Sequence, residues 1–83
     1  MNSKNIKILD RIFTNPIQAN INWTDIENLF IALGADIKEG RGSRVRVCLN
    51  DVVAVFHRPH PKKETDKGAV KSVRKFLENA GVK

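Results

Sequence analysis

The segment that most constrains the fold of this chain runs from Arg44 to His57, RVRVCLNDVVAVFH. Between Arg44 and Leu49 apolar and polar side chains alternate, which is typical of a strand with one buried face. Asn50-Asp51 separates this run from a second one, Val52 to His57, and a short loop of that composition favours a type I′ turn. The sequence therefore predicts an antiparallel hairpin with strands at residues 44–49 and 52–57.

The tight turn also predicts which residues of the two strands lie opposite each other. On one face every pair would be apolar, namely Leu49 with Val52, Val47 with Ala54 and Val45 with Phe56. A slip of one residue would turn this whole set towards water, so the pattern supports the register independently. On the other face Arg44 would lie opposite His57 and Arg46 opposite Val55, with Cβ atoms roughly 4.5–5.5 Å apart.

Two segments before the hairpin carry the apolar period of a helix. The first helix would run from about Lys4 to Phe13, with Ser3 as its cap and Asn15-Pro16 as its end. Its apolar side would consist of Ile6, Leu9, Ile12 and Phe13. A second helix would begin at the capping box Thr24–Glu27 and end at Gly34.

A third helix would follow the hairpin, with Asp66 as its cap and Gly81 at its end. Its buried stripe would be Val70, Val73, Leu77 and Ala80, and its opposite side Lys67, Lys71, Arg74 and Glu78. A short strand, Ala35 to Glu39, would precede the hairpin and join it through the turn Gly40-Arg41-Gly42. The predicted order is α-α-β-β-β-α, an α+β fold with a three-stranded antiparallel sheet packed on helices.

Charge and composition point to an anionic partner. Lys and Arg together number 15 against 9 Asp and Glu, a net charge of +6 that favours nucleic acid. The single cysteine, Cys48, permits no internal disulfide and suits a reduced compartment. We find neither a signal-peptide pattern nor an apolar run long enough to cross a membrane, and we therefore expect a cytoplasmic protein.

Residues 21–82 resemble the HicA-type toxins nearly throughout. The resemblance rests on WTDIENLFIALGA, EGRGSRVRV, FHRPHP and DKGAVKSVRKFLENAGV, in this order. It implies a fold like that of the double-stranded-RNA-binding domain, with 1–83 as one domain, 21–83 as its core and 1–20 as an N-terminal helical extension. It also implies the toxin of a type II toxin–antitoxin system: a metal-independent ribonuclease that cleaves mRNA, halts translation and is held inactive by a HicB-type antitoxin.

One position departs from the family pattern. Most members read Gly-Ser/Thr-His at the turn before the middle strand, and that histidine is taken as catalytic, whereas this chain has Arg44. Cleaving RNA without a metal requires a base for the 2′-OH proton and positive charge for the phosphate oxygens. Histidine suits the first task and the planar fork of arginine the second. We therefore predict His57 as the general acid–base and Arg44 as a phosphate clamp. The alternative is that His57 only sits on a polar sheet face before a proline-rich turn.

Further residues near this pair are expected to bind RNA. Lysines at the start of the last helix lie where the helix dipole and free amides also favour phosphate. The expected RNA-binding residues are Arg41, Ser43, Arg46, Arg58, His60, Lys62, Lys63 and Lys67. The alternative for the lysines is a solvated charged loop.

Neither a metal nor a cofactor is expected. His57 and His60 are the only histidines, and Cys48 would pair with Val53, several residues from them, whereas a zinc site needs three or four ligands. Two other functions stay open. The chain could be a non-catalytic RNA-binding module in which Arg44 marks loss of the nuclease, or an interaction domain whose basic face binds an acidic protein.

Overall fold

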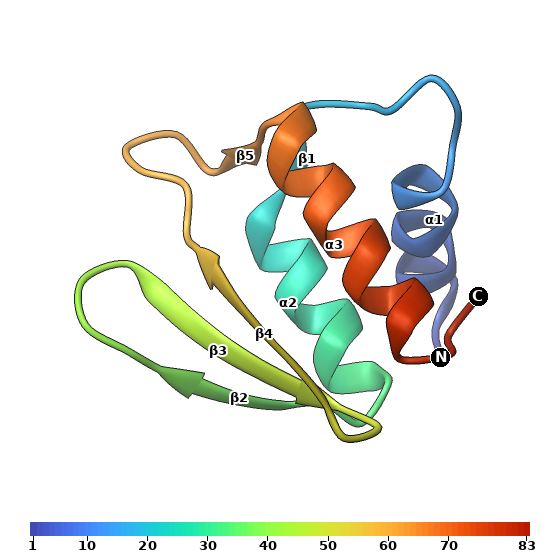
Figure 1. Cartoon of the computed structure of the whole chain (residues 1–83). Helices are drawn as coiled ribbons and strands as arrows, with labels where there is room; N and C mark the ends of the chain where they lie inside the picture. Colours follow the sequence, from blue (N-terminus) through green and yellow to red (C-terminus); the bar gives the residue numbers. More distant parts are fainter.

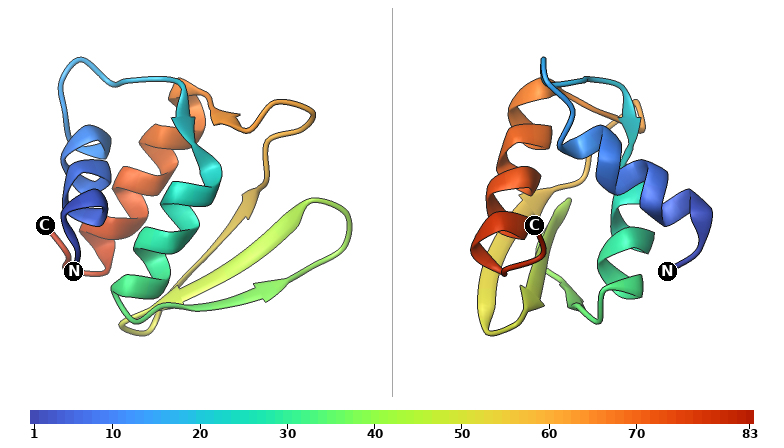
Figure 2. Two further views of the ribbon diagram at one scale, coloured as in Figure 1. Left: turned by 180° about the vertical axis from the view of Figure 1, so that it is seen from behind. Right: turned by 90° about the vertical axis from the view of Figure 1, so that its right-hand side faces the viewer.

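A computed structural model describes residues 1–83, which form three helices and five strands. These are α1 (Ser3–Ile12), β1 (Ile21–Asn22), α2 (Trp23–Ala32), β2 (Asp36–Glu39), β3 (Arg44–Leu49), β4 (Val52–His57), β5 (Glu64–Thr65) and α3 (Lys67–Asn79). Strands β2, β3 and β4 form an antiparallel sheet in that order, and α2 and α3 cover one of its faces (Figure 1). Helix α1 lies on the far side of these two helices from the sheet (Figure 2). The expected α+β arrangement, like that of the double-stranded-RNA-binding domain, is confirmed.

The β3–β4 hairpin has the predicted bounds and the predicted register. Its residue pairs are Arg44–His57, Val45–Phe56, Arg46–Val55, Val47–Ala54, Cys48–Val53 and Leu49–Val52. Asn50 and Asp51 both have positive φ, 51° and 67°, as a type I′ turn requires. The Asn50 side chain also donates a hydrogen bond to the carbonyl of Ala80 (2.8 Å), which joins the hairpin tip to the end of α3.

Four aromatic rings form the centre of the core between the sheet and the two helices. Trp23 and Phe30 come from α2, Phe56 from β4 and Phe76 from α3, and the five ring pairs among them have centroids 5.6–6.4 Å apart. All four residues are buried. Because successive side chains of a strand point to opposite faces, burial of Phe56 sends its neighbour His57 to the open face of the sheet.

Helix α1 is present but differs in detail from the prediction. Its cap is Asn2, whose side chain accepts a hydrogen bond from the amide of Asn5 (2.9 Å), so Ser3 is the first helical residue and not the cap. Ile8 and Ile12 are its buried residues, whereas Ile6 is 47% exposed. The apolar residues allow two overlapping stripes, and contact with both α2 and α3 selects the one through Ile8.

The start of α2 also differs. Its cap is Asn22, which accepts from the amide of Thr24 (2.9 Å), and the helix begins at Trp23. The predicted capping box is wrong, because the cap is Asn22 and not Thr24, and the Glu27 carboxylate bonds to the indole of Trp23 and to Arg58. At α3 the Asp66 cap is confirmed by a bond from the amide of Ala69 (2.8 Å).

Two elements were not predicted. Strands β1 and β5 pair over two residues each, Ile21 with Thr65 and Asn22 with Glu64. Strands this short are below the length at which alternation can be recognised. None of the helices is both long enough and apolar enough to span a membrane.

Candidate functional site

The side chains of interest lie on the sheet face that α2 and α3 leave open (Figure 2). Arg44 lies opposite His57, and the row beside them consists of Lys38, Arg46 and Val55 from the three strands. All five residues are exposed. The face therefore carries three basic side chains and one imidazole. It also has an apolar strip on β4, where Val53 and Val55 are 47% and 56% exposed.

Backbone hydrogen bonds hold the end of this hairpin in place. The amide of Arg58 donates to the carbonyl of Ser43 (2.8 Å), which extends the β3–β4 ladder one residue beyond the Arg44–His57 pair. Across the preceding turn, the amide of Gly40 donates to Arg44 (2.9 Å) and the amide of Arg44 to Arg41 (3.2 Å). The structure thus brings four predicted site residues together, Arg41, Ser43, Arg44 and His57.

The side chains of Arg44 and His57 have no hydrogen-bonding or ion-pair partner in the protein. Because each is exposed and unpaired, each is free to meet a ligand. An imidazole and a guanidinium on adjacent strands can transfer protons and bind a phosphate at the same point. We refer to this pair as the candidate site.

Arg58, by contrast, is fully engaged by protein carboxylates. Its Nε and Nη2 donate to the two oxygens of Glu27 (2.7 and 3.1 Å), and its Nη1 donates to Glu39 (2.6 Å). Glu27 also accepts from the indole nitrogen of Trp23. These bonds, first to Glu27 and then to Glu39, raise the pKa of the Arg58 guanidinium above its ordinary value. We call Arg58, Glu27, Glu39 and Trp23 the Arg58 clamp, which joins the end of β4 to α2 and β2.

The sequence predicts that Arg58 binds RNA. In the structure its Nε, Nη1 and Nη2 all donate to Glu27 or Glu39, and RNA binding by Arg58 stays a prediction. Glu27 and Glu39 were missed, because they lie 31 and 19 residues from Arg58 in the chain. The acidic Glu27 also satisfied the capping-box pattern, so no local signal separated the two roles.

The remaining predicted residues lie along the segment between β4 and α3 and at the first residue of α3. His60, Lys62, Lys63 and Lys67 are all exposed, and none forms an ion pair. The amide of Trp23 donates to the carbonyl of Lys63 (2.9 Å), which fixes the end of this segment against the start of α2. We call residues 59–63 the basic loop. It projects from the sheet beside the start of α3 (Figure 1).

No three His, Cys, Asp or Glu side chains are grouped as metal ligands would be. Cys48 is half-buried on β3, where it pairs with Asp36 on one side and Val53 on the other.

Comparison with known proteins gives one match. The model of the family described as "HicA toxin of bacterial toxin-antitoxin" matches residues 23–82. This range contains α2, the three-stranded sheet, the candidate site, the basic loop and α3, and leaves α1 and β1 outside. No curated protein and no solved structure matches the chain. Because the family match spans most of the sequence, the chain belongs to the HicA family and is a toxin of a bacterial toxin–antitoxin system.

Proposed function

We propose that this toxin is a cytoplasmic ribonuclease that cleaves mRNA at the candidate site and so inhibits translation. The observation that carries the proposal is the pairing of Arg44, the first residue of β3, with His57, the last residue of β4. Both side chains are exposed and free of protein partners, in a chain that carries a net charge of +6.

The proposed reaction uses the 2′-OH of the RNA as the nucleophile. His57 accepts the 2′-OH proton while that oxygen attacks the adjacent phosphorus, and the bond from phosphorus to the 5′-oxygen of the next nucleotide breaks. The imidazolium then returns the proton to the departing 5′-oxygen, which leaves a 2′,3′-cyclic phosphate and a 5′-hydroxyl. Arg44 binds the non-bridging phosphate oxygens and stabilises the charge that develops on them. Proton transfer and charge stabilisation are then both supplied by side chains, so the mechanism requires no metal.

The residues around the candidate site would hold the RNA strand. Arg41, Ser43 and Arg46 lie beside Arg44 on the same hairpin and its turn. His60, Lys62, Lys63 and Lys67 would bind the backbone on the side of the basic loop. Contacts of this kind position the strand and contribute most of the salt-dependent affinity.

We further propose that the cognate antitoxin is of the HicB type. Binding of an acidic or apolar antitoxin surface to the open sheet face would exclude RNA from the candidate site. The exposed Val53 and Val55 beside Arg46 supply apolar contact area for such a partner.

A second function is favoured by one specific observation. The family's usual histidine position holds Arg44, and a chain that had lost its nuclease would still present the same cationic face. Such a protein would bind RNA without cutting it.

Incubating the purified toxin with end-labelled RNA separates the two functions. Cleavage that persists in chelator and leaves cyclic-phosphate ends supports the proposed nuclease. Salt-dependent retention of intact RNA would select the non-catalytic binding module instead.

A further inference from the structure

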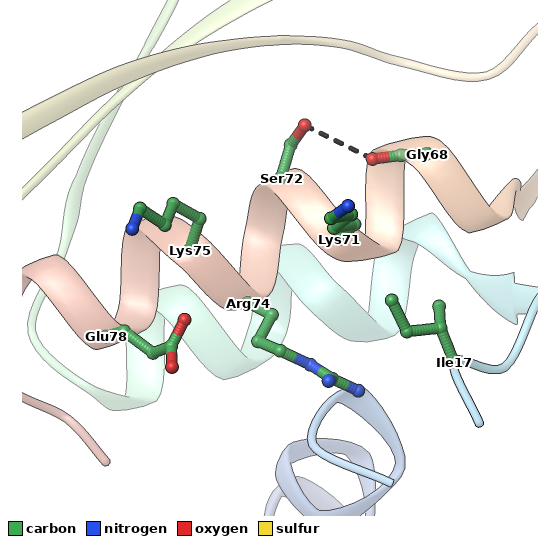
Figure 3. Close-up of a pocket in the computed structure, with 7 residues that line it drawn as sticks. All are labelled: Ile17, Gly68, Lys71, Ser72, Arg74, Lys75 and Glu78. Atoms are coloured by element: carbon green, nitrogen blue, oxygen red, sulfur yellow. Dashed lines mark hydrogen bonds between the residues drawn. The ribbon is translucent and has the colours of Figure 1, made fainter. Parts of the chain in front are cut away.

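A groove lies along the solvent-facing side of α3, apart from every residue of the candidate site (Figure 3). It has a volume of about 360 Å³ and is lined by α3 residues between Gly68 and Glu78, together with Ile17 from the segment between α1 and β1. Sites for small ligands have volumes of roughly 300–1,000 Å³, so the groove is large enough for one nucleotide-sized group.

Arg74 fixes one wall of the groove. Its Nε and Nη2 donate to the carbonyls of Ile12 and Thr14 (2.8 Å each), and its Nη1 donates to the Asn15 side chain (3.0 Å). The sequence placed Arg74 on the solvent side of α3, but these bonds make it half-buried. The segment that follows α1 is thereby held against α3. Ile17, which lines the groove from this segment, lies outside the family match.

The free charges of the groove are two lysines. Lys71 and Lys75 are exposed and have no ion-pair partner, and Glu78 is the only acidic residue in the lining. Residues four apart lie on one face of a helix, about 6 Å further along its axis at each step. Lys67, Lys71 and Lys75 therefore form a row that leads from the start of α3 into the groove.

Gly68 leaves the entrance to the groove open. A Cβ atom built there would meet only the Asp66 side chain, at 3.5 Å, so nothing else occupies the space beside it. An extended ligand in contact with Lys67 can thus reach Lys71 without passing over a side chain at position 68.

We propose that the α3 groove is a second RNA subsite, which binds one nucleotide of the strand that extends away from the candidate site. Lys71 and Lys75 contact its phosphate, and Ile17 packs against the apolar part of the nucleotide. This inference rests on the proposed function, because it takes RNA as the substrate. Charge favours RNA as the occupant, since two unpaired lysines flank the groove and continue the row of lysines that begins with Lys67 at the start of α3.

Two variant pairs test the charge of the subsite in a His57→Ala background, which removes cleavage and leaves binding. Lys71→Ala/Lys75→Ala should reduce the slope of log affinity against log salt by roughly 0.7 to 0.9 for each phosphate that the protein no longer binds. The control is Lys4→Ala/Lys7→Ala, which removes two positive charges from α1, one of them paired with Asp25 (3.1 Å), and should leave the slope unchanged. An unchanged slope for the α3 pair, or an equal fall for both pairs, would overturn the proposal.

A third variant tests the shape of the subsite without changing its charge. Gly68→Leu places a side chain in the groove and favours the helix, so affinity for RNA should fall several-fold in a stably folded protein. Gly68→Ala, the control, should bind RNA as the parent does. If Gly68→Leu binds RNA normally and instead loses the antitoxin, the groove belongs to the protein partner and the RNA subsite is refuted. A parent that neither binds nor cuts RNA would refute the proposed function itself.

Discussion

His57 and Arg58 are neighbours in the chain with opposite surroundings. His57 is exposed and unpaired on the open sheet face, whereas Arg58 holds two carboxylates that belong to α2 and β2. Any movement of the Arg58 backbone would also move His57 relative to Arg44. The Arg58 clamp is therefore expected to position the candidate site, whether or not Arg58 also contacts RNA.

Glu27→Gln tests this positioning role. It removes the charge that binds Arg58 at a side chain that is 18% exposed, so we expect a loss of about 1–3 kcal/mol in unfolding free energy. Cleavage should slow while the salt slope of RNA binding stays unchanged. Glu39→Gln is the control, because its side chain is 74% exposed and exposed ion pairs contribute under about 1 kcal/mol. Urea unfolding and single-turnover cleavage measure both effects. Equal losses for the two variants would contradict the account, and a reduced salt slope for Arg58→Ala would show that Arg58 contacts RNA after all.

The sequence predicted the elements unevenly, for physical reasons. The β3–β4 hairpin was predicted with its register because alternation and a tight turn both constrain it, and that register placed Arg44 opposite His57. Strands β1 and β5 escaped prediction because each has two residues, and their pairing depends on segments more than 40 residues apart. The caps Asn2 and Asn22 were missed because Ser3 and Thr24, one and two residues later, are equally good capping residues.

Helix α1 lies outside the family match but packs directly on the core. Ile12 is fully buried, so Ile12→Ala should lower the unfolding free energy by about 2–5 kcal/mol. Ile6→Ala on the same helix should cost far less, since Ile6 is 47% exposed. Denaturant midpoints of the two variants measure the difference. Similar midpoints would show that α1 is not part of the folded core.

The basic loop and the start of α3 should act as one binding element. Replacing Lys62, Lys63 and Lys67 together by Ala should weaken RNA binding, and the log–log salt slope should fall by roughly 0.7 to 0.9 for every phosphate left without its lysine. Folding should change little, because all three side chains are exposed and only the backbone of Lys63 bonds to Trp23. A slope equal to that of the parent would show that these lysines are solvated and do not contact RNA phosphates.

The whole molecule has two unlike sides, because the helices cover one sheet face and leave the other open (Figure 2). Its net charge of +6 favours the approach of an anionic partner. We expect the antitoxin to cover either the sheet face around Arg44, Arg46 and His57 or the adjacent start of α3. Hydrogen exchange of the free and bound toxin would locate the interface. Protection confined to other surfaces would indicate that inhibition does not work by blocking RNA.

In the proposed reaction, His57 performs the proton transfers of RNA cleavage beside Arg44. The most direct measurement is the cleavage rate of a His57→Ala variant whose circular dichroism and RNA affinity match those of the parent. General acid–base catalysis contributes roughly 10²- to 10⁴-fold, so the rate should fall by that factor and toxicity should be lost. Arg44→Ala should also be impaired, through weaker stabilisation of the phosphate. A folded His57→Ala variant that cuts RNA as fast as the parent would show that His57 does not perform the proton transfers.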